Sequence, residues 1–252
     1  MNGVWICTED WGDPLHAPSG CRQRAKRKPS VPDALFNPTA AAALLDFFAL
    51  AERLKTELRH SWLSNDRQES VAEHTWMMAL MAVTLAPSLE HPVDLGHVLK
   101  LIIVHDLAEV KVGDIPVFEV SDRKNAKMEA ELAAISEIQA MLPEESGKLI
   151  TSLWHEYEAA TTVEARFARA LDHLEVQVQH NLASIDTWEP IEHDLVYTKM
   201  DDRCAYDQGL REMVQAVRGR AERKLTEGGF DIAALRGRHG FVPKEPKDSQ
   251  IS

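Results

Sequence analysis

His105, Asp106 and Glu109 place three polar side chains inside one of the most apolar segments of the sequence. An apolar run precedes them and Gly113 and Pro116 follow, so the pattern predicts a buried helix that ends near these two residues. A buried histidine or carboxylate is costly unless it is paired or bound to a cation. On a helix, Glu109 lies four residues after His105 and three after Asp106, so all three can face one cleft. These residues indicate either a helix-cap network around a core histidine or part of a metal-binding or catalytic site.

Two further residues favour the metal site. His74 follows a capping box that runs from Ser70 to Glu73, in which Glu73 has a structural role, and Asp172 lies on a strongly periodic segment. Helix-bundle metal sites collect ligands from several facing helices. Two imidazoles and two carboxylates suit a divalent Mn, Fe, Co, Ni or Zn ion and leave positions open for water and substrate. Four candidate ligands thus come from separate segments: His74, His105, Asp106 and Asp172.

The segments that must position these residues have helical periodicity, and none has convincing strand alternation. We expect an all-α fold, a compact helical bundle with irregular N- and C-terminal tails. Residues 1–36 form a flexible extension in this interpretation, residues 37–227 the folded domain and residues 228–252 a loose tail. A loop is expected at about 187–201. The expected helices cover approximately residues 37–62, 70–87, 94–113, 123–142, 143–157, 163–182 and 203–225.

Composition limits the possible partners. The chain has 252 residues and a formal net charge of -12, which opposes general binding to nucleic acid or to an anionic membrane. No apolar run reaches the length of a bilayer span, and the first residues lack the order of a secretory signal. Cys7, Cys21 and Cys204 lack metal-type spacing and are expected to be reduced thiols. We therefore expect a cytoplasmic protein with no nucleic-acid or membrane partner.

The ordered set of motifs resembles the HD-domain metal-dependent phosphohydrolases. Within that family, the sequence is most similar to the branch that contains bacterial and eukaryotic 5'-deoxyribonucleotidases, over roughly residues 45–185. A bare His-Asp pair is weak evidence, but several longer motifs match in order. These motifs are Glu69–His74, His105–Glu109, Gly113–Ile115 and Glu156–Glu158.

The resemblance implies roles for the residues of the metal site. It makes His74, His105, Asp106 and Asp172 the metal ligands, and Glu109 the acid that handles the reacting water or the leaving-group proton. A carboxylate beside a metal can act as a general acid or base, which agrees with this role.

The resemblance also implies substrate-binding residues. Arg59 matches the position used for the phosphate and Trp62 the position used for the sugar, while Lys127 stands near a lysine of the family. Asp114 matches a second acidic residue on the sugar side, which we count with Glu109 as catalytic. Trp62 alone can equally be a core residue, and Arg59 a cation at a helix C-terminus.

Three positions depart from the family pattern. Ser61 replaces a glycine beside the sugar site, His173 replaces a lysine after the last aspartate, and His155 replaces an acidic residue. Two-metal HD proteins, including oxygenases, carry two further histidines between the His-Asp pair and the final aspartate. His155 is the only histidine in that interval here, so we expect one divalent metal (Co, Mn, Fe, Ni or Zn) per chain.

The expected function is a metal-dependent phosphomonoesterase that hydrolyses (deoxy)nucleoside 5'-monophosphates to nucleoside and phosphate. The expected partners are a small-molecule nucleotide and a second copy of the chain in a homodimer. The alternatives are an HD-type nucleoside triphosphate triphosphohydrolase, which needs more cations near the metal, and a non-catalytic nucleotide-binding HD protein. A di-iron oxygenase is disfavoured by the missing histidines.

Overall fold

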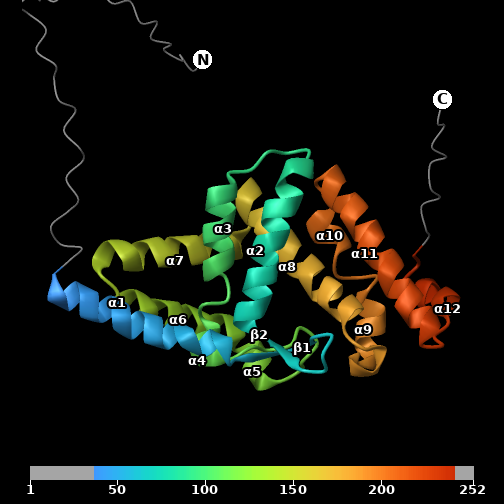
Figure 1. The fold of residues 1–252 in the computed structure, drawn as a ribbon, viewed down its shortest axis with the longest axis horizontal. Coiled ribbons are helices and arrows are strands. Elements are labelled where there is room, and N and C mark those ends of the chain that lie inside the picture. The colour runs from blue at the N-terminus through green and yellow to red at the C-terminus, as the bar shows by residue number, and fades with distance from the viewer. Residues whose placement is uncertain (1–36, 242–252) are drawn as a thin grey trace, which may run out of the picture.

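The computed structural model describes residues 37–241, and these form a helical body with one small sheet (Figure 1). The predicted all-α class is confirmed. Short 3-10 turns cover Glu52–Lys55, Ala86–Ser88 and Ile185–Thr187. The helices are α1 (Pro38–Ala51), α2 (Val71–Leu85), α3 (Leu95–Val104), α4 (Glu109–Val112), α5 (Asp122–Asn125), α6 (Lys127–Met141), α7 (Glu144–Ala159), α8 (Val163–Leu182), α9 (Pro190–Leu195), α10 (Asp201–Cys204), α11 (Gln208–Glu227) and α12 (Ile232–Arg238).

Helix α8 lies at the centre of the body and packs against α2, α3, α7 and α11. Its apolar stripe is fully buried, with Phe167, Leu171 and Leu174 all at 0% exposure. Asp172 belongs to the same helix and is next to this stripe in sequence. Because α8 is held on several sides, it is a rigid base from which a side chain can reach a site between helices.

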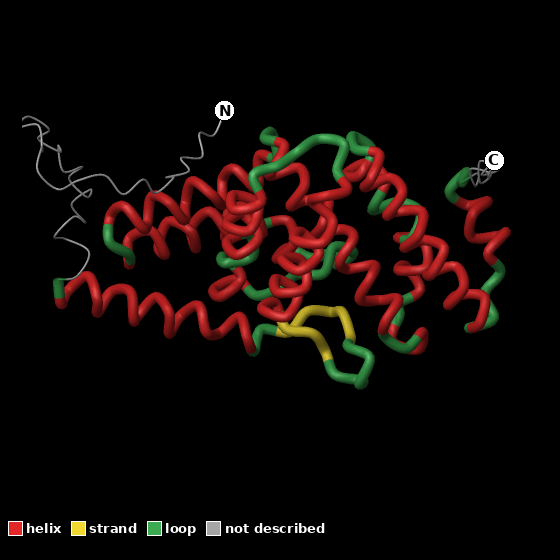
Figure 2. The backbone as a smooth tube through the Cα atoms, turned by 45° about the horizontal axis from the view of Figure 1, so that its top comes forward, coloured by secondary structure: helices red, strands yellow, loops and turns green. Residues whose placement is uncertain are grey.

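A β-hairpin replaces part of the first predicted helix. Strands β1 (Leu58–Trp62) and β2 (Gln68–Ser70) are antiparallel and lie beside the start of α2 (Figure 2). The prediction of one helix from residue 37 to residue 62 is therefore wrong, since α1 ends at Ala51. The strands are short and their register is irregular between Leu58 and Trp62, so the sequence carries no clear two-residue period.

The start of α2 is as predicted. The Ser70 side chain accepts a hydrogen bond from the Glu73 backbone, and the Glu73 carboxylate accepts one from the Ser70 backbone at 2.9 Å. Arg67 also donates to Glu73, at 2.6 Å. This capping box sets the direction in which α2 enters the body, and His74 follows it directly.

The third predicted helix is interrupted at the functional motif. Helix α3 ends at Val104, and the backbone of His105–Ala108 makes tighter turns before α4 begins at Glu109. The N–H of Glu109 donates to the carbonyl of Asp106 at 3.0 Å, a three-residue spacing. The prediction of one continuous helix is wrong here, although the three polar residues remain in one compact segment.

The C-terminal part of the body has its own small core. Trp188, Tyr197, Leu225 and Leu235 belong to a second buried cluster in which α12 packs against α11. The structure thus differs from the expected loose tail after residue 227, because burial of Leu235 holds α12 in place. It also places α9 in the expected loop at 187–201. The expected extension at 1–36 and the end of the tail, 242–252, lie outside the described residues.

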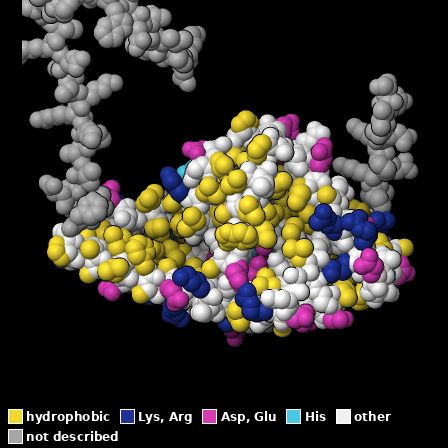
Figure 3. Space-filling view, viewed as in Figure 1, with side chains coloured by type: hydrophobic (Ala, Val, Ile, Leu, Met, Phe, Trp, Pro, Cys, Tyr) yellow, Lys and Arg dark blue, Asp and Glu magenta, His cyan; other side chains and the backbone are white. Residues whose placement is uncertain are grey.

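Exposed apolar side chains gather on the face of the molecule that carries α1, α2 and α3 (Figure 3). Trp76, Leu80 and Val83 lie on one side of α2 and are 63%, 44% and 47% exposed. Within residues 37–241, no helix combines the length and apolar character needed to cross a membrane.

Candidate functional site

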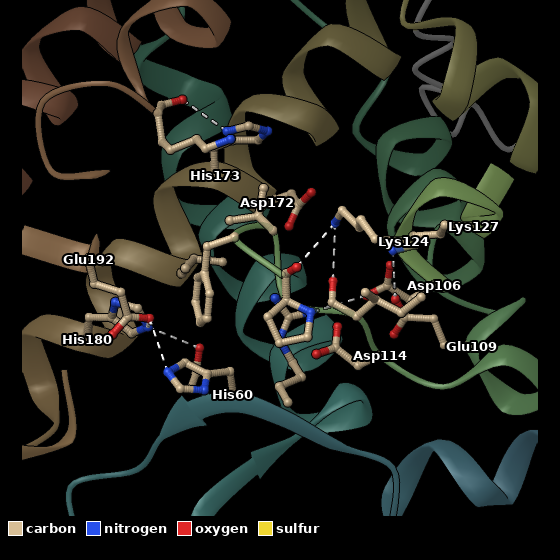
Figure 4. Close-up of a pocket in the computed structure, with 18 of the residues that line it drawn as sticks. His60, Asp106, Glu109, Asp114, Lys124, Lys127, Asp172, His173, His180 and Glu192 are labelled. Atoms are coloured by element: carbon tan, nitrogen blue, oxygen red, sulfur yellow. Dashed lines mark hydrogen bonds and ion pairs between the residues drawn. The ribbon is translucent and has the colours of Figure 1, made fainter. Parts of the chain in front are cut away.

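A cavity of about 270 Å³ lies where β1, the segment after α4, α6 and α8 meet (Figure 4). Its wall combines acidic, basic, imidazole and apolar groups. The residues that line it include Arg59, His60, Ser61, Asp106, Glu109, Asp114, Val117, Phe118, Lys124, Lys127, Arg169, Asp172, His173, Val176, His180, Glu192 and Lys199.

The structure brings all four predicted metal ligands together beside this cavity, with Asp106 and Asp172 on its wall. One ligand atom each from His74, His105 and Asp172 lies within 4.8 Å of the other two. Asp106 completes the group, because its Oδ2 lies 3.0 Å from the Nε2 of His105 and 4.0 Å from that of His74. Three separate segments supply these side chains: α2, the turn after α3, and α8.

The two imidazoles are oriented as metal ligands are. The Nδ1 atom of His74 lies 2.5 Å from Oε2 of Glu175, and the Nδ1 atom of His105 lies 2.7 Å from the carbonyl oxygen of Ile102. These partners favour the N–H on Nδ1 in both rings, which leaves the lone pair on Nε2. Both Nε2 atoms are buried without a hydrogen-bond partner. Buried polar atoms of this kind are costly, and a cation between the rings satisfies both.

The two carboxylates are held by polar neighbours. The Tyr157 hydroxyl donates to Oδ2 of Asp172 at 3.0 Å, and Arg59 donates to Oδ2 of Asp106 at 3.3 Å. Burial acts to raise the pKa of Asp106, but His105 and Arg59 outweigh it and hold this pKa below its ordinary value. Asp106 is therefore ionised, as a metal ligand must be.

Arg59 reaches the site from β1 rather than from a helix end. Its guanidinium lies between Asp106 and Glu69, with its Nε 3.7 Å from a Glu69 oxygen. The side chain is only 12% exposed. Arg59 therefore lies on the cavity wall and also offsets the negative charge of the neighbouring carboxylates.

Glu109 and Lys127 meet on the wall formed by α4 and α6. Lys127 donates to Oε1 of Glu109 at 3.5 Å and also lies 3.3 Å from Glu131. The other Glu109 oxygen is buried without a hydrogen-bond partner. Burial, followed by the charges of Asp106 and Asp114, raises the pKa of Glu109 to about 9. In this arrangement Glu109 holds a proton near neutral pH.

Asp114 is positioned by a turn that needs glycine. Gly113 ends α4 with φ at 75°, a conformation that side chains disfavour, and a Cβ there meets Glu57 at 2.9 Å. The same Glu57 oxygen accepts the Asp114 N–H at 3.1 Å. This turn brings Asp114 to the wall of the cavity, which Arg59 and Glu109 also line.

Trp62 is a predicted substrate-binding residue that does not line the cavity. It ends β1, and its carbonyl oxygen accepts a hydrogen bond from Gln179 at 2.6 Å. The indole is not among the groups that line the cavity, whereas its neighbour Ser61 is. The contact between Trp62 and a sugar stays a prediction.

The other departures from the family pattern fall on different sides of the site. His173 lines the cavity, and its Nδ1 lies 3.0 Å from the carbonyl oxygen of Lys199. His155 is exposed on α7, packs beside Trp154 and does not line the cavity.

Several contributors were missed by sequence reasoning. Glu175 follows Asp172 by three residues and is fully buried within the apolar stripe of α8. A charged residue inside an apolar stripe is the sequence signal that could have identified it. Arg169 stacks on Tyr157 with 4.6 Å between its guanidinium carbon and the ring centroid. Glu192 and Lys199 were invisible because they lie in the segment expected to be a loop.

Comparisons with known proteins agree with this geometry. A family model described as an HD domain matches residues 51–223. The human protein named 5'-deoxynucleotidase HDDC2 is 34% identical over 167 residues, which cover 65% of this chain and 77% of that protein. The Schizosaccharomyces pombe protein named 5'-deoxynucleotidase hdd1 is 32% identical over 149 residues, covering 57% and 73% of the two chains.

A solved structure has the same fold. It is described as a predicted metal-dependent phosphohydrolase from Magnetospirillum magnetotacticum MS-1 and superposes with a TM-score of 0.61 at 26% sequence identity. The match covers 77% of this chain and 96% of that chain. With the family model spanning most of the folded body, and with the four motif residues gathered in one cluster, the chain belongs to the HD-domain family.

Proposed function

We propose that this protein is a metal-dependent phosphomonoesterase that hydrolyses deoxynucleoside 5'-monophosphates to nucleoside and phosphate. The observation that carries the proposal is the pair of buried Nε2 atoms of His74 and His105, which make no hydrogen bond and face Asp172 at 3.4 Å and Asp106 at 3.0 Å, two carboxylates on the cavity wall. The names of the 5'-deoxynucleotidase relatives support the substrate class.

The residues present fit a divalent transition metal. His74, His105, Asp106 and Asp172 would hold one ion of Co, Mn, Fe, Ni or Zn, a mixed nitrogen and oxygen set that suits these metals. When bound, the ion supplies Lewis-acid polarisation of the phosphate and activation of the attacking water. Support for a single ion comes from His155, which is exposed and stands outside the cavity.

Cationic side chains of the wall bind the phosphate. Lys124, Lys127, Arg169 and Lys199 line the cavity together with Arg59. Lys127 is fixed between Glu109 and Glu131, so its ammonium is already oriented when a substrate enters. Arg59 offers a planar guanidinium for phosphate oxygens, while its contact with Asp106 keeps it beside the metal ligands.

Glu109 is the proton donor in this proposal. Water attacks phosphorus, the bond from phosphorus to the 5'-oxygen breaks, and the Glu109 carboxyl gives its proton to that departing oxygen; a proton from the attacking water then restores the Glu109 carboxyl. The products are a neutral nucleoside and inorganic phosphate. Burial, which raises the pKa of Glu109, supports the protonated carboxyl that general-acid catalysis requires. Asp114 is placed to accept a hydrogen bond from the sugar.

Preference for a deoxyribose sugar is also part of the proposal. The relatives' names support it, and the indole of Trp62 is not among the groups that line the cavity. Ser61 and Asp114, which line the cavity, are the groups that remain available near the sugar. Equal kcat/KM values for dAMP and AMP contradict this preference.

The test is metal-dependent phosphate release from a panel of ribo- and deoxyribonucleoside 5'-monophosphates. The protein is stripped of metal, reloaded with each candidate ion and assayed for phosphate, and deoxynucleoside triphosphates are assayed in parallel for released triphosphate. Phosphate release that depends on metal supports the proposal. Release of triphosphate without activity on monophosphates identifies the triphosphohydrolase, and tight nucleotide binding without turnover identifies a binding protein.

We also expect a cytoplasmic homodimer. The exposed apolar face of α2, with Trp76, Leu80 and Val83, supports association with a second copy, because such patches are uncommon on monomers. Light scattering coupled to size-exclusion chromatography measures the mass. A monomeric wild-type protein, or a Leu80→Glu variant that remains dimeric, contradicts the expected interface.

A further inference from the structure

The side of the cavity away from Lys127 and Glu109 carries a second polar cluster, formed by His60, His180 and Glu192 (Figure 4). The Nε2 atoms of both histidines lie 3.4 Å from the same oxygen, Oε1 of Glu192. The Ser61 hydroxyl lies 3.4 Å from the Nε2 of His180. All four residues line the cavity, and they come from β1, α8 and α9.

Glu192 orients His60 and has little capacity left for a ligand. Its residue exposure is 2%, and its second oxygen accepts the backbone N–H of Glu189 at 2.7 Å. The contact with Glu192 raises the pKa of His60, whereas burial lowers the pKa of His180. The carboxylate thus favours a positive charge on His60 while both of its own oxygens are engaged.

His60 is the member of the cluster that is open to a ligand. Its side chain is 26% exposed, compared with 9% for His180 and 3% for Glu192. Its Nε2 lies within ion-pair distance of Glu192 without a hydrogen bond, and no hydrogen-bond partner is found for the other ring nitrogen, Nδ1, within residues 37–241. A protonated His60 therefore offers one N–H donor that the protein itself does not use.

An apolar wall stands beside this donor. The Phe118 ring meets His60 edge to face, with 5.0 Å between centroids, and Val117 and Val176 also line the cavity. A flat aromatic ligand can pack on such a wall while its edge meets the imidazole. In a nucleotide whose phosphate lies at the Lys127 end, the base is the part that extends away from the metal ligands.

We propose that His60, held by Glu192, forms a nucleobase subsite that favours bases carrying a carbonyl oxygen over bases carrying an amino group at the corresponding position. This proposal rests on the proposed nucleotidase function and specifies which monophosphates the site prefers. Guanine presents an O6 acceptor and thymine an O4 acceptor at the position where adenine and cytosine present an amino donor, while the N7 acceptor is common to both purines.

The preference follows from the number of available donors and acceptors. The cationic N–H of His60 can donate a charge-assisted hydrogen bond to O6 or O4. An amino group at the same position presents another N–H donor to it and no acceptor. Glu192 cannot relieve that clash of donors, because both of its oxygens are engaged. A site built to donate discriminates against a group that cannot accept, by an expected factor of about 10 or more in kcat/KM.

The experiment compares kcat/KM for dGMP with dAMP, and for dTMP with dCMP, in the metal-loaded protein and in His60→Phe. Phenylalanine keeps an aromatic ring beside Phe118 and removes both ring nitrogens. His91→Phe is the matched control, since His91 lies 3.3 Å from the buried Asp207 but does not line the cavity. We expect wild type and His91→Phe to favour the carbonyl bases about 10-fold and His60→Phe to lose that ratio.

A purely structural role of the cluster gives a different result. If His60 only joins β1 to α9, the variant lowers activity on all four monophosphates equally and leaves both ratios unchanged, which overturns the proposal. Equal ratios near one in the wild type overturn it as well. Glu192→Gln keeps the shape but removes the charge that favours protonated His60, and it is expected to reduce both ratios at neutral pH.

A binding measurement separates failure of this proposal from failure of the proposed function. Calorimetric titration with deoxyguanosine and deoxyadenosine, which lack phosphate, reports the base subsite alone. Activity on monophosphates with equal binding of the two nucleosides overturns the subsite and leaves the phosphatase intact. Tighter, His60-dependent binding of deoxyguanosine without any phosphate release overturns the phosphatase and retains the subsite.

Discussion

The Nδ1 atom of His74 lies 2.5 Å from Oε2 of Glu175, and both side chains are completely buried. This contact joins α2 to α8, the two helices that contribute His74 and Asp172 to the candidate metal site. It directs the N–H of the imidazole away from the cavity and its Nε2 lone pair toward Asp172, at 3.4 Å. A buried carboxylate behind a histidine also makes that histidine a better ligand. The packing of two helices and the chemistry of the site thus depend on one pair.

Glu175→Gln is expected to weaken metal binding by a factor of about 10 to 100, the usual effect of losing a partner behind a ligand. The amide keeps the size of the side chain but not its charge, so we expect the helical fold to remain. Metal titration by calorimetry and far-ultraviolet circular dichroism measure the two effects. Glu222→Gln is the control, because Glu222 pairs with Arg236 at the distant C-terminal core. Unchanged metal affinity in Glu175→Gln contradicts the orienting role.

Asp106→Ala is expected to abolish metal binding and phosphate release while most of the helical structure remains. The change removes a charged ligand and also leaves Arg59 without its 3.3 Å partner beside the two histidines. An unbalanced guanidinium there repels a cation. Elemental analysis of the purified variant measures occupancy, with Asp202→Ala on the exposed surface of α10 as control. Full metal occupancy in Asp106→Ala rules out Asp106 as a ligand.

Much of this site was accessible from the sequence because its signals are local. The Ser70–Glu73 capping box, the His105–Asp106 pair within an apolar run and the stripe around Asp172 each occupy one short segment. Each therefore remains recognisable without knowledge of the fold. The order of these motifs along the chain resembles that of a known family, and this indicated that the separate segments form one site. Helical periodicity alone does not show which segments meet. The four candidate ligands lie in one cluster in the structure.

What was missed depends on contacts between distant segments. Strand β1 is stabilised by pairing with β2 across an irregular register, which leaves no period to detect. Glu192 reaches the cavity only because α9 folds back beside β1 and α8, placing its carboxylate 3.4 Å from His60. Leu235 is buried in a second hydrophobic core. The short, charged segment that forms α12 gives no sign of this burial in the sequence. Such effects arise from tertiary packing rather than from local propensity.

Glu109→Gln is expected to retain metal and to lose turnover by about 10²- to 10⁴-fold, the usual scale for a positioned acid. Glutamine keeps the contact with Lys127 but has no acidic proton for the departing 5'-oxygen. Elemental analysis and steady-state phosphate release measure occupancy and kcat. Glu137→Gln is a suitable control, since Glu137 lies on the same helix as Lys127 and pairs with Lys111 at 2.6 Å outside the cavity. Joint loss of metal and activity identifies Glu109 as a ligand instead.

The base preference is expected to depend on pH through His60. The contact with Glu192, aided by the charges of Glu192, Glu189 and Asp114 and opposed by burial, raises the His60 pKa above 6.5. Because the protonated ring is the donor, the ratio of kcat/KM for dGMP over dAMP is greatest below this raised pKa. It falls as pH rises through it. Using a ratio removes the titration of Glu109 and of the metal site, which affect both substrates equally.

Glu192→Gln provides the matched comparison for that pH profile. Removing the carboxylate returns the His60 pKa toward or below 6.5, because burial lowers this pKa and the contact with Glu192 no longer offsets it. The decline in the ratio is therefore expected at lower pH in this variant than in the wild type. His91→Phe, which alters a histidine outside the cavity, is expected to keep the wild-type profile. A ratio that is independent of pH in the wild type, or a decline at the same pH in Glu192→Gln, contradicts protonated His60 as the group that selects the base.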